Sequence, residues 1–480
     1  MPKITLIGAG SLIFSKTLVM DILATEALAG SEICLMNRTK PKLDMAEAFV
    51  KRVIRENHLP ARVSATLDRG QALDGADYVV ILIQVGGLEA FRIDHEVPLR
   101  YGVDQCIGDS LGPGGVFRAL RTIPVLQQIS GEMEFRCPQA VILNYANPMA
   151  ANCLALGKIT HIPYIGLCHG VQTTLDLIGR YVEVPKQRIE YLCAGINHMA
   201  WFLKLADQAD GRDLYPVLRE NIEKPEYYIN EKVRCEVMRH FGYFMTESTG
   251  HLSEYIPWFR SHRRALELYC DQPGFGGASG AYYKYSQMLE DKYQGVDYLA
   301  RESALIKSRS VEYCSYILEA MESGMPFRLN GNIRNDGYIT NLPNGACVEV
   351  PVYVDRLGLH PLRIGNLPPQ CAALNRSNIS VQELTVEAAL SGNPELAMQA
   401  IAIDPLTSAV CTLKEARDMT AEMLSAQQQW LPQFQGTHLK TYPSIAIPAD
   451  VQPVKVPLDP ALAIANRFQE LAEGPATPET

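Results

Sequence analysis

Five short runs of apolar residues in the first 170 positions constrain the fold more than any other feature of this sequence. The runs are continuously apolar, as strands are when helices cover both faces of a parallel sheet. Helical patterns follow the first two runs, over about 12–23 and 41–56. This alternation predicts an α/β fold built on a doubly wound parallel sheet, with strands at 3–7, 32–36, 76–84, 140–144 and 164–168.

The alternation weakens after about residue 200, which predicts a change of architecture. Helical spacing returns near 230–245, 285–325 and 380–430, and a strand is expected at 347–354. The end of the chain is rich in proline before a weak helix at 460–472, so it is expected to lie along the surface or to be partly disordered. We therefore expect a nucleotide-binding domain, a mixed α/β domain for substrate and metal, and a tail, at 1–195, 196–435 and 436–480.

Directly after the first strand, Gly8-Ala9-Gly10-Ser11 opens the first helix. Glycines at such a turn let the backbone approach a pyrophosphate, whose charge is favoured by the helix N-terminus. Ile13 replaces the third glycine of the usual dinucleotide fingerprint, so a tight turn without a nucleotide is the alternative interpretation.

The position after the second strand bears on the choice of cofactor. Asn37-Arg38 stands there in place of the acid that usually binds the adenosine ribose of NAD. Because an arginine at this position can accommodate a 2′-phosphate, NADP stays an alternative to NAD, and a solvated turn is the simpler interpretation of Arg38.

Two polar motifs follow predicted strands, at the sheet edge where ligands of open α/β folds bind. Asn144 and Asn147, in the sequence NYANP, offer donors and acceptors that suit sugar hydroxyls, although an Asn-Pro turn without a ligand would look the same. Cys168 follows the next strand, and His198 comes some thirty residues later. A thiolate and an imidazole can share a divalent ion, but this spacing alone is weak evidence for one.

A dense group of ionisable side chains lies further along, in a segment with little regular pattern. Its members are Tyr243, Glu247, His251, Glu254 and Tyr255. Taken alone, a solvated helix face explains this segment as well as a functional site does.

Composition excludes several kinds of partner. The net charge is −9, without the clusters of Lys and Arg that nucleic-acid binding requires. No run approaches the ~20 apolar residues of a membrane span, and the N-terminus lacks the features of a signal peptide. The 12 cysteines have no short-spaced pairs, as expected of reduced thiols. The sequence therefore predicts a cytoplasmic protein that binds neither nucleic acid nor membranes.

Together these motifs resemble glycoside hydrolase family 4, over roughly residues 3–435. The resemblance rests on the order GAGS, LGPGGVFRALRTIP (111–124), NYANP, CHGVQ, GINHMAW (195–201), GYFMTES, NGNIRNDGYITNLPNGACVEVP (330–351) and GNLPPQCAALNRSNISVQELTVEA (365–388). It implies a Rossmann-like domain joined to a mixed α/β domain, as in lactate and malate dehydrogenases, assembled as a homodimer or homotetramer. The likeness is greatest to bacterial α-galactosidases of the melibiase type, with α-glucosidases and α-glucuronidases as relatives.

Carried over by position, the resemblance implies that Cys168 and His198 bind Mn²⁺ or a similar ion. It implies a catalytic acid at position 169, here a histidine, and a base near Tyr243, with Glu247 as the alternative. The expected cofactor contacts are Gly8, Ala9, Gly10, Ser11, Asn37 and Asn144. The expected substrate contacts are Asn147, Arg92 and Asn197.

The implied reaction is the NAD-dependent exception to the usual two-carboxylate scheme of glycosidases. Oxidation at C3 of an α-linked di- or oligosaccharide would make the C2 hydrogen acidic. The base would remove it, the C1 substituent would leave, water would add, and the hydride would return to C3. The metal would act as a Lewis acid on the sugar oxygens.

The sugar itself is open at this stage. Cys168-His169-Gly170 differs from the Cys-His-Ser common in the melibiase type, and it favours a sugar without phosphate. Galactose, glucose and a uronic acid all remain, and a uronate would need an arginine such as Arg92 or Arg334. An NAD-dependent hydroxy-acid or polyol dehydrogenase is the alternative from another reaction class, and it would accumulate NADH.

Overall fold

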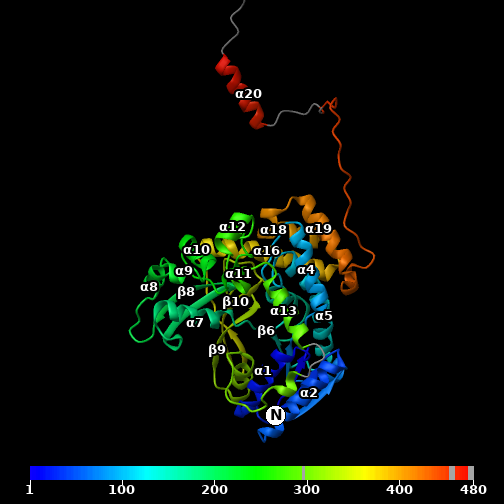
Figure 1. Ribbon diagram of the computed structural model, residues 1–480, viewed down its shortest axis with the longest axis vertical. Helices are drawn as coiled ribbons and strands as arrows, with labels where there is room; N and C mark the ends of the chain where they lie inside the picture. The colour runs from blue at the N-terminus through cyan, green and yellow to red at the C-terminus, as the bar shows by residue number, and fades with distance from the viewer. Residues whose placement is uncertain (294–297, 453, 455–459, 474–480) are drawn as a thin grey trace, which may run out of the picture. The chain divides into compact units, whose positions relative to one another are not determined.

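The computed structural model in Figure 1 describes residues 1–293, 298–452, 454 and 460–473. Two units are distinct in it, Met1–Leu439 and Lys440–Thr480, and the first contains the whole sheet. Half of this sheet is parallel, in the order β3-β2-β1-β4-β5-β6. Its strands are β1 Lys3–Ile7, β2 Glu32–Met36, β3 Arg62–Thr66, β4 Tyr78–Ile81, β5 Val141–Asn144 and β6 Tyr164–Gly166.

The predicted parallel sheet is confirmed, and its strand order is that of dinucleotide-binding folds. The order reverses between β1 and β4, which is the point where such folds bind their ligands. Strand β3 was not predicted, because its residues alternate between exposed and half-buried at the edge of the sheet.

The other half of the sheet is antiparallel and joins the first at β6, where Gly166 pairs with Asn332. The predicted strand at 347–354 is confirmed as β10, and a hairpin of β7 and β8 lies beside it. The expected division at 195/196 falls at the end of β7, and the sheet continues across it. The strands are β7 Ile189–Ile196, β8 Met199–Asp207, β9 Phe327–Arg334, β10 Cys347–Asp355 and β11 Gly358–Pro361.

Helices cover the sheet, and α5, α6 and α16 pack against one another. The predicted helix at 41–56 is confirmed, whereas the helical spacing at 285–325 belongs to three shorter helices. In the first unit the helices are α1 Leu12–Leu23, α2 Lys40–Glu56, α3 Arg69–Leu73, α4 Gly87–Arg100, α5 Gly112–Arg136, α6 Met149–Ile159, α7 Gly170–Val182, α8 Tyr215–Asn221, α9 Pro225–Tyr228, α10 Lys232–Phe241, α11 Thr249–Leu252, α12 Arg263–Tyr269, α13 Ala281–Tyr293, α14 Tyr298–Arg301, α15 Cys314–Ser323, α16 Pro369–Ser391, α17 Pro394–Ile403, α18 Pro405–Val410 and α19 Leu413–Ala426.

The second unit, taken by itself, has neither helix nor strand over 440–452 and then forms helix α20 Pro460–Glu473. This matches the helix predicted at 460–472. No helix within the described residues is long and apolar enough to cross a membrane.

Candidate active site

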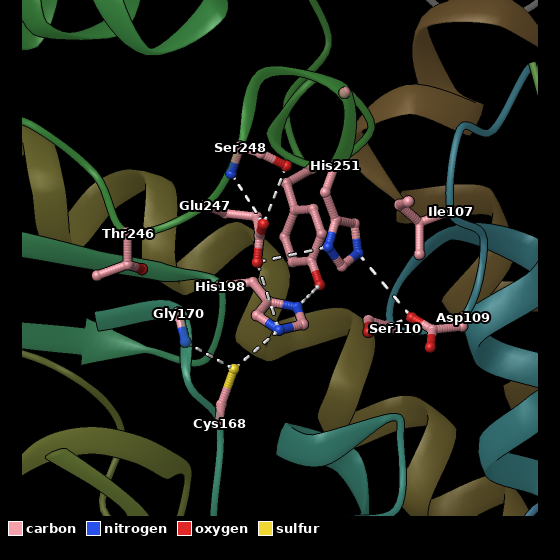
Figure 2. A network of polar contacts seen from close by, with 12 residues as sticks. Ile107, Asp109, Ser110, Cys168, Gly170, His198, Thr246, Glu247, Ser248 and His251 are labelled. Atoms are coloured by element: carbon pink, nitrogen blue, oxygen red, sulfur yellow. Dashed lines mark hydrogen bonds and ion pairs between the residues drawn. The ribbon is translucent and has the colours of Figure 1, made fainter. Parts of the chain in front are cut away.

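The structure brings Cys168 and His198 together although thirty residues separate them in the sequence. Cys168 lies between β6 and α7, and His198 lies in the two-residue turn that joins β7 to β8. The sulfur of Cys168 lies 3.3 Å from Nε2 of His198 (Figure 2). The pair therefore stands at the carboxyl edge of the sheet, where the sequence predicted it.

The His198 ring is fixed from its other side. Its backbone has φ 63°, a left-handed conformation that only a few per cent of non-glycine residues adopt. Nδ1 lies 2.9 Å from the hydroxyl of Tyr255, which leaves Nε2 to face Cys168. Burial lowers the pKa of His198 to about 4, so the imidazole is neutral near pH 7. A neutral imidazole held through its second nitrogen is the usual state of a metal-binding histidine.

Cys168 lies at the N-terminus of α7, where the backbone N–H of Gly170 donates to its sulfur over 3.5 Å. Burial, with Glu349 nearby, raises the pKa of this thiol well above its usual value. A thiolate here therefore needs a cation beside it, which a bound divalent metal would provide.

Glu247 and His251 complete a buried cluster around His198. Oε2 of Glu247 lies 3.5 Å from Nε2 of His198 and 3.5 Å from Nδ1 of His251. One ligand atom from each of these three residues lies within 4.8 Å of the others, a spacing that could hold a metal ion. Burial opposes the charges, yet the two imidazoles hold the pKa of Glu247 well below its usual range, and Glu247 raises that of His251 to about 9.

The donors in this cluster fit the metal that the sequence implies. Sulfur and imidazole suit a borderline divalent ion such as Zn²⁺, and the carboxylate also suits a harder one such as Mn²⁺. Nε2 of His251 is buried here beyond hydrogen-bond distance of the two carboxylates it faces, which lie 3.6 Å away on Glu254 and 4.0 Å away on Asp109. The cluster is therefore built for more than packing.

A loop before α5 brings a further acid to the site. Glu254 accepts hydrogen bonds from the backbone N–H groups of Cys106, Ile107 and Gly108, at 2.7–3.1 Å. This contact fixes Asp109, the next residue of the loop, whose Oδ2 accepts a hydrogen bond of 2.9 Å from the amide of Asn147. The expected substrate residue therefore has its amide orientation set by a buried carboxylate.

No role was predicted from the sequence for Asp109, His251, Glu254 or Tyr255. Asp109 lies two residues before the segment 111–124 that carries part of the family resemblance, but no periodicity marks it. The four-residue spacing of Glu247, His251 and Tyr255 was the available signal, because residues four apart share a face of a helical turn.

The glycine turn fits a dinucleotide. Gly8 has φ 94°, and a Cβ there would stand 2.7 Å from the carbonyl oxygen of Leu82. Gly8 therefore needs to be glycine, whereas a Cβ on Gly10 would meet the side chain of Asn37 and require it to move. Ser11 is the exposed N-cap of α1 and makes no side-chain capping bond, which leaves first-turn N–H groups for an anion. Ala9 is buried beneath this turn.

Three expected residues have other contacts. Asn144 is fully buried, and its amide bonds to the backbone of Ala146. The ring of Tyr243 packs edge-on against Tyr215 at 6.0 Å. Arg92 is half-exposed on α4 and pairs with Glu96 at 2.7 Å.

His169 follows Cys168 in the sequence, and Asn197 precedes His198. His169 is exposed at the start of α7, with Nδ1 3.6 Å from a carboxylate oxygen of Glu312. Asn197 is buried, and its side chain lies against both Cys168 and Glu349. Burial, with Glu247 nearby, raises the pKa of Glu349 to about 8.

Comparison with known proteins agrees with this geometry. The model of the family 4 glycosyl hydrolases matches residues 3–184, and the model of their C-terminal domain matches 193–407. An α-galactosidase of Bacillus subtilis (strain 168) is 41% identical over 90% of this chain and 100% of its own length. One of Rhizobium meliloti (strain 1021) is 40% identical over 90% of this chain and 89% of its own.

A solved structure shares the fold. It is a 6-phospho-α-glucosidase from gut microorganisms in complex with NAD and Mn²⁺, with a TM-score of 0.73 and 19% identity over 90% of this chain and 99% of that one. With its fold, its motifs and two relatives 40–41% identical over 89–100% of their own length, this chain belongs to family 4 of the glycosyl hydrolases.

Proposed function

We propose that this chain is an α-galactosidase that depends on NAD and a divalent metal. One observation carries the proposal: the Cys168 and His198 donors, 3.3 Å apart, stand at the ligand edge of a dinucleotide-binding sheet. The two α-galactosidases at 40–41% identity support galactose as the sugar.

The chain has residues that would hold the divalent metal and residues that would hold the dinucleotide. Cys168 and His198 would hold the metal, and the Gly8–Ser11 turn with Asn37 would hold the dinucleotide. When bound, a nicotinamide supplies reversible hydride transfer and a divalent metal supplies Lewis acidity. NADP is the alternative dinucleotide because Asn37 brings no acid to the ribose position.

The remaining residues bind substrate and move protons. Asn147 donates its N–H to Asp109, which leaves its oxygen to accept from a sugar hydroxyl. Glu247 and Tyr243 are the candidates for the base that removes the C2 proton, and His169, next to Cys168, would protonate the departing oxygen at C1.

A neutral sugar is favoured over a uronate. A uronate carboxylate would need a free guanidinium near the cluster. Arg92 pairs with Glu96, and Arg334 pairs with Asp336 at 3.0 Å, so both considered arginines have acid partners.

The chain would work in the cytoplasm, as a homodimer or homotetramer. All 12 cysteines are free thiols, which suits a reducing compartment. Light scattering on the purified protein tests the assembly.

The first test is hydrolysis of nitrophenyl α-galactoside, α-glucoside and α-glucuronide by the purified full chain. Each substrate is run with and without NAD, NADP, Mn²⁺ and thiol, beside a Cys168→Ser variant. We expect release of nitrophenol from the galactoside that requires dinucleotide, Mn²⁺ and Cys168, without net formation of NADH. Hydrolysis that proceeds equally well without a dinucleotide and without Mn²⁺ contradicts the mechanism. Steady NADH formation from a hydroxy acid or polyol favours the dehydrogenase.

A further inference from the structure

The carboxylate of Glu247 reaches toward the space that Cys168 and His198 share. Its Oε2 lies 3.5 Å from Nε2 of His198, the same nitrogen that faces the sulfur of Cys168 at 3.3 Å (Figure 2). Nε2 of His198 therefore has a sulfur donor and a carboxylate donor beside it, each from a separate segment of the chain.

The two oxygens of Glu247 have different surroundings. Oε1 accepts from the backbone N–H of Ser248 at 2.8 Å and from its hydroxyl at 3.1 Å, and this fixes the carboxylate plane. Oε2 lies 3.5 Å from a ring nitrogen of His198 and 3.5 Å from one of His251. One oxygen is anchored to the backbone, and the other faces the cluster.

Glu247, His198 and His251 each have a ligand atom within 4.8 Å of the others, and each donor pair at Nε2 of His198 has the spacing of neighbouring metal ligands. Metal–ligand bonds of about 2.0–2.3 Å, at angles near 90–110°, place neighbouring ligand atoms about 3–3.5 Å apart. The separation of 3.3 Å from sulfur to Nε2 and that of 3.5 Å from Nε2 to Oε2 agree with this geometry.

His251 is placed to hold the carboxylate of Glu247. Its Nδ1 faces Glu247, and its Nε2 faces Glu254 at 3.6 Å and Asp109 at 4.0 Å. An imidazole between acids is arranged to donate hydrogen bonds. Carboxylates that bind metals are themselves held by such donors.

We propose that Glu247 is a third protein ligand of the divalent metal, with Cys168 and His198, and that His251 positions it. This inference rests on the proposed function, which supplies the metal and the first two ligands. It removes Glu247 from the two candidates for the C2 base and leaves Tyr243.

The test measures Mn²⁺ binding by the full chain without substrate, from the EPR signal of free Mn²⁺. In Glu247→Gln we expect the Kd for Mn²⁺ to rise at least about tenfold. Mutation of a residue that only supports a metal ligand already weakens metal affinity by about 10–100-fold. Ser248→Ala is the matched control, because it removes a hydrogen bond to Oε1 and leaves Oε2 in place. Cys168→Ser should lose binding. An unchanged Kd in Glu247→Gln, with loss of solvent-deuterium exchange at C2 of the sugar, would overturn the proposal and make Glu247 the base.

A second measurement does not depend on a variant that folds. In Mn²⁺-loaded wild-type crystals, anomalous scattering locates the ion, and Oε2 of Glu247 should lie within about 2.0–2.2 Å of it, the usual range for carboxylate ligands. An ion bound by Cys168 and His198 with Glu247 out of reach overturns this inference alone. Failure of the wild-type protein to bind Mn²⁺ would count against the proposed function as well.

Discussion

At His198 the geometry is set by contacts on three sides. The left-handed backbone places the ring at the tip of the β7–β8 turn, Tyr255 faces Nδ1, and Cys168 faces Nε2. If Nε2 is to carry its lone pair toward a metal, Nδ1 must carry the proton and donate it to the Tyr255 oxygen. In that tautomer the Tyr255 hydroxyl accepts from Nδ1 and holds the ring with Nε2 toward the ion.

Tyr255→Phe removes this acceptor while keeping the ring that packs in the core. We expect the Kd for Mn²⁺ to rise about 10–100-fold, as for other residues that orient a metal ligand. Tyr164→Phe is the control, because its buried hydroxyl has no hydrogen-bond partner in the described structure. Titration of both variants with Mn²⁺ checks this, and equal affinities would show that the tautomer is set elsewhere.

Asp109→Asn tests how the substrate amide is oriented. Asp109 is buried and accepts from Asn147 at 2.9 Å and from the Ser110 hydroxyl at 2.7 Å. An amide in its place no longer selects which end of Asn147 faces the sugar. A hydrogen bond to a charged group contributes about 1.5–3 kcal/mol, so we expect KM for the galactoside to rise about tenfold or more. The Kd for Mn²⁺ should stay constant, and steady-state kinetics that show an unchanged KM would contradict this role.

At the scale of elements, the continuously apolar strands could be predicted, because burial on both faces leaves one clear pattern. Strands β1, β2, β4, β5 and β6 were found in this way. The edge strand β3 and the strands β7, β8, β9 and β11 were missed. Pairing such as that of Gly166 with Asn332 depends on tertiary contacts that no local pattern encodes.

The site residues also divide into those that local sequence motifs indicate and those that only tertiary contacts bring to the site. Cys168, His198 and Glu247 were named through family motifs, and the structure brings them together. Asp109 was missed, because it reaches the site through a loop that Glu254 holds. Its importance lies in a contact between residues 109 and 147 that the sequence alone does not indicate.

A buried ion pair joins α4 to α5. The guanidinium of Arg121 binds both oxygens of Asp94, at 2.6 and 2.9 Å, and Gln427 at the end of α19 donates to the same carboxylate. Both charges are almost fully buried. Arg121→Met leaves Asp94 without its counter-ion, so we expect a loss of about 3–5 kcal/mol in the free energy of unfolding.

The double variant Asp94→Leu/Arg121→Met is the control. Removing both charges avoids the unpaired acid, so most of the lost stability should return. Chemical denaturation measures both variants. A double variant as unstable as the single one would mean that packing, and not charge, accounts for the loss.

Asp404 makes stability depend on pH. Burial raises its pKa to about 6, although Thr407 donates to it from backbone and side chain. The folded state thus holds the proton more tightly than the unfolded chain. This stabilisation is complete below about pH 4 and is lost as the pH rises through about 6, a change of about 3 kcal/mol. Asp404→Asn should remove it, so its stability relative to wild type should rise between pH 4 and pH 7. Parallel denaturation curves at both pH values would contradict the prediction.

At the scale of the molecule, one continuous sheet positions both the dinucleotide site and the metal site. The parallel strands form the dinucleotide edge, and the β7–β8 hairpin adds His198 to it. The two family models meet between residues 184 and 193, at the start of β7. Because the sheet is continuous there, both ligands should stabilise one folded body while binding at separate residues.

Thermal unfolding can separate the two sites. A ligand that binds only the folded state at about 100 times its Kd adds about 2.7 kcal/mol to stability, so NAD and Mn²⁺ should each raise Tm. Cys168→Ser should lose the rise caused by Mn²⁺ and keep the one caused by NAD, because the glycine turn of Gly8 and Gly10 is untouched. An equal rise with Mn²⁺ in the variant would exclude Cys168 as a ligand. A missing rise with NAD in wild type, and with NADP as well, would instead count against the dinucleotide site. Because this measurement needs no turnover, it tests the chain's two binding sites independently of which sugar it hydrolyses.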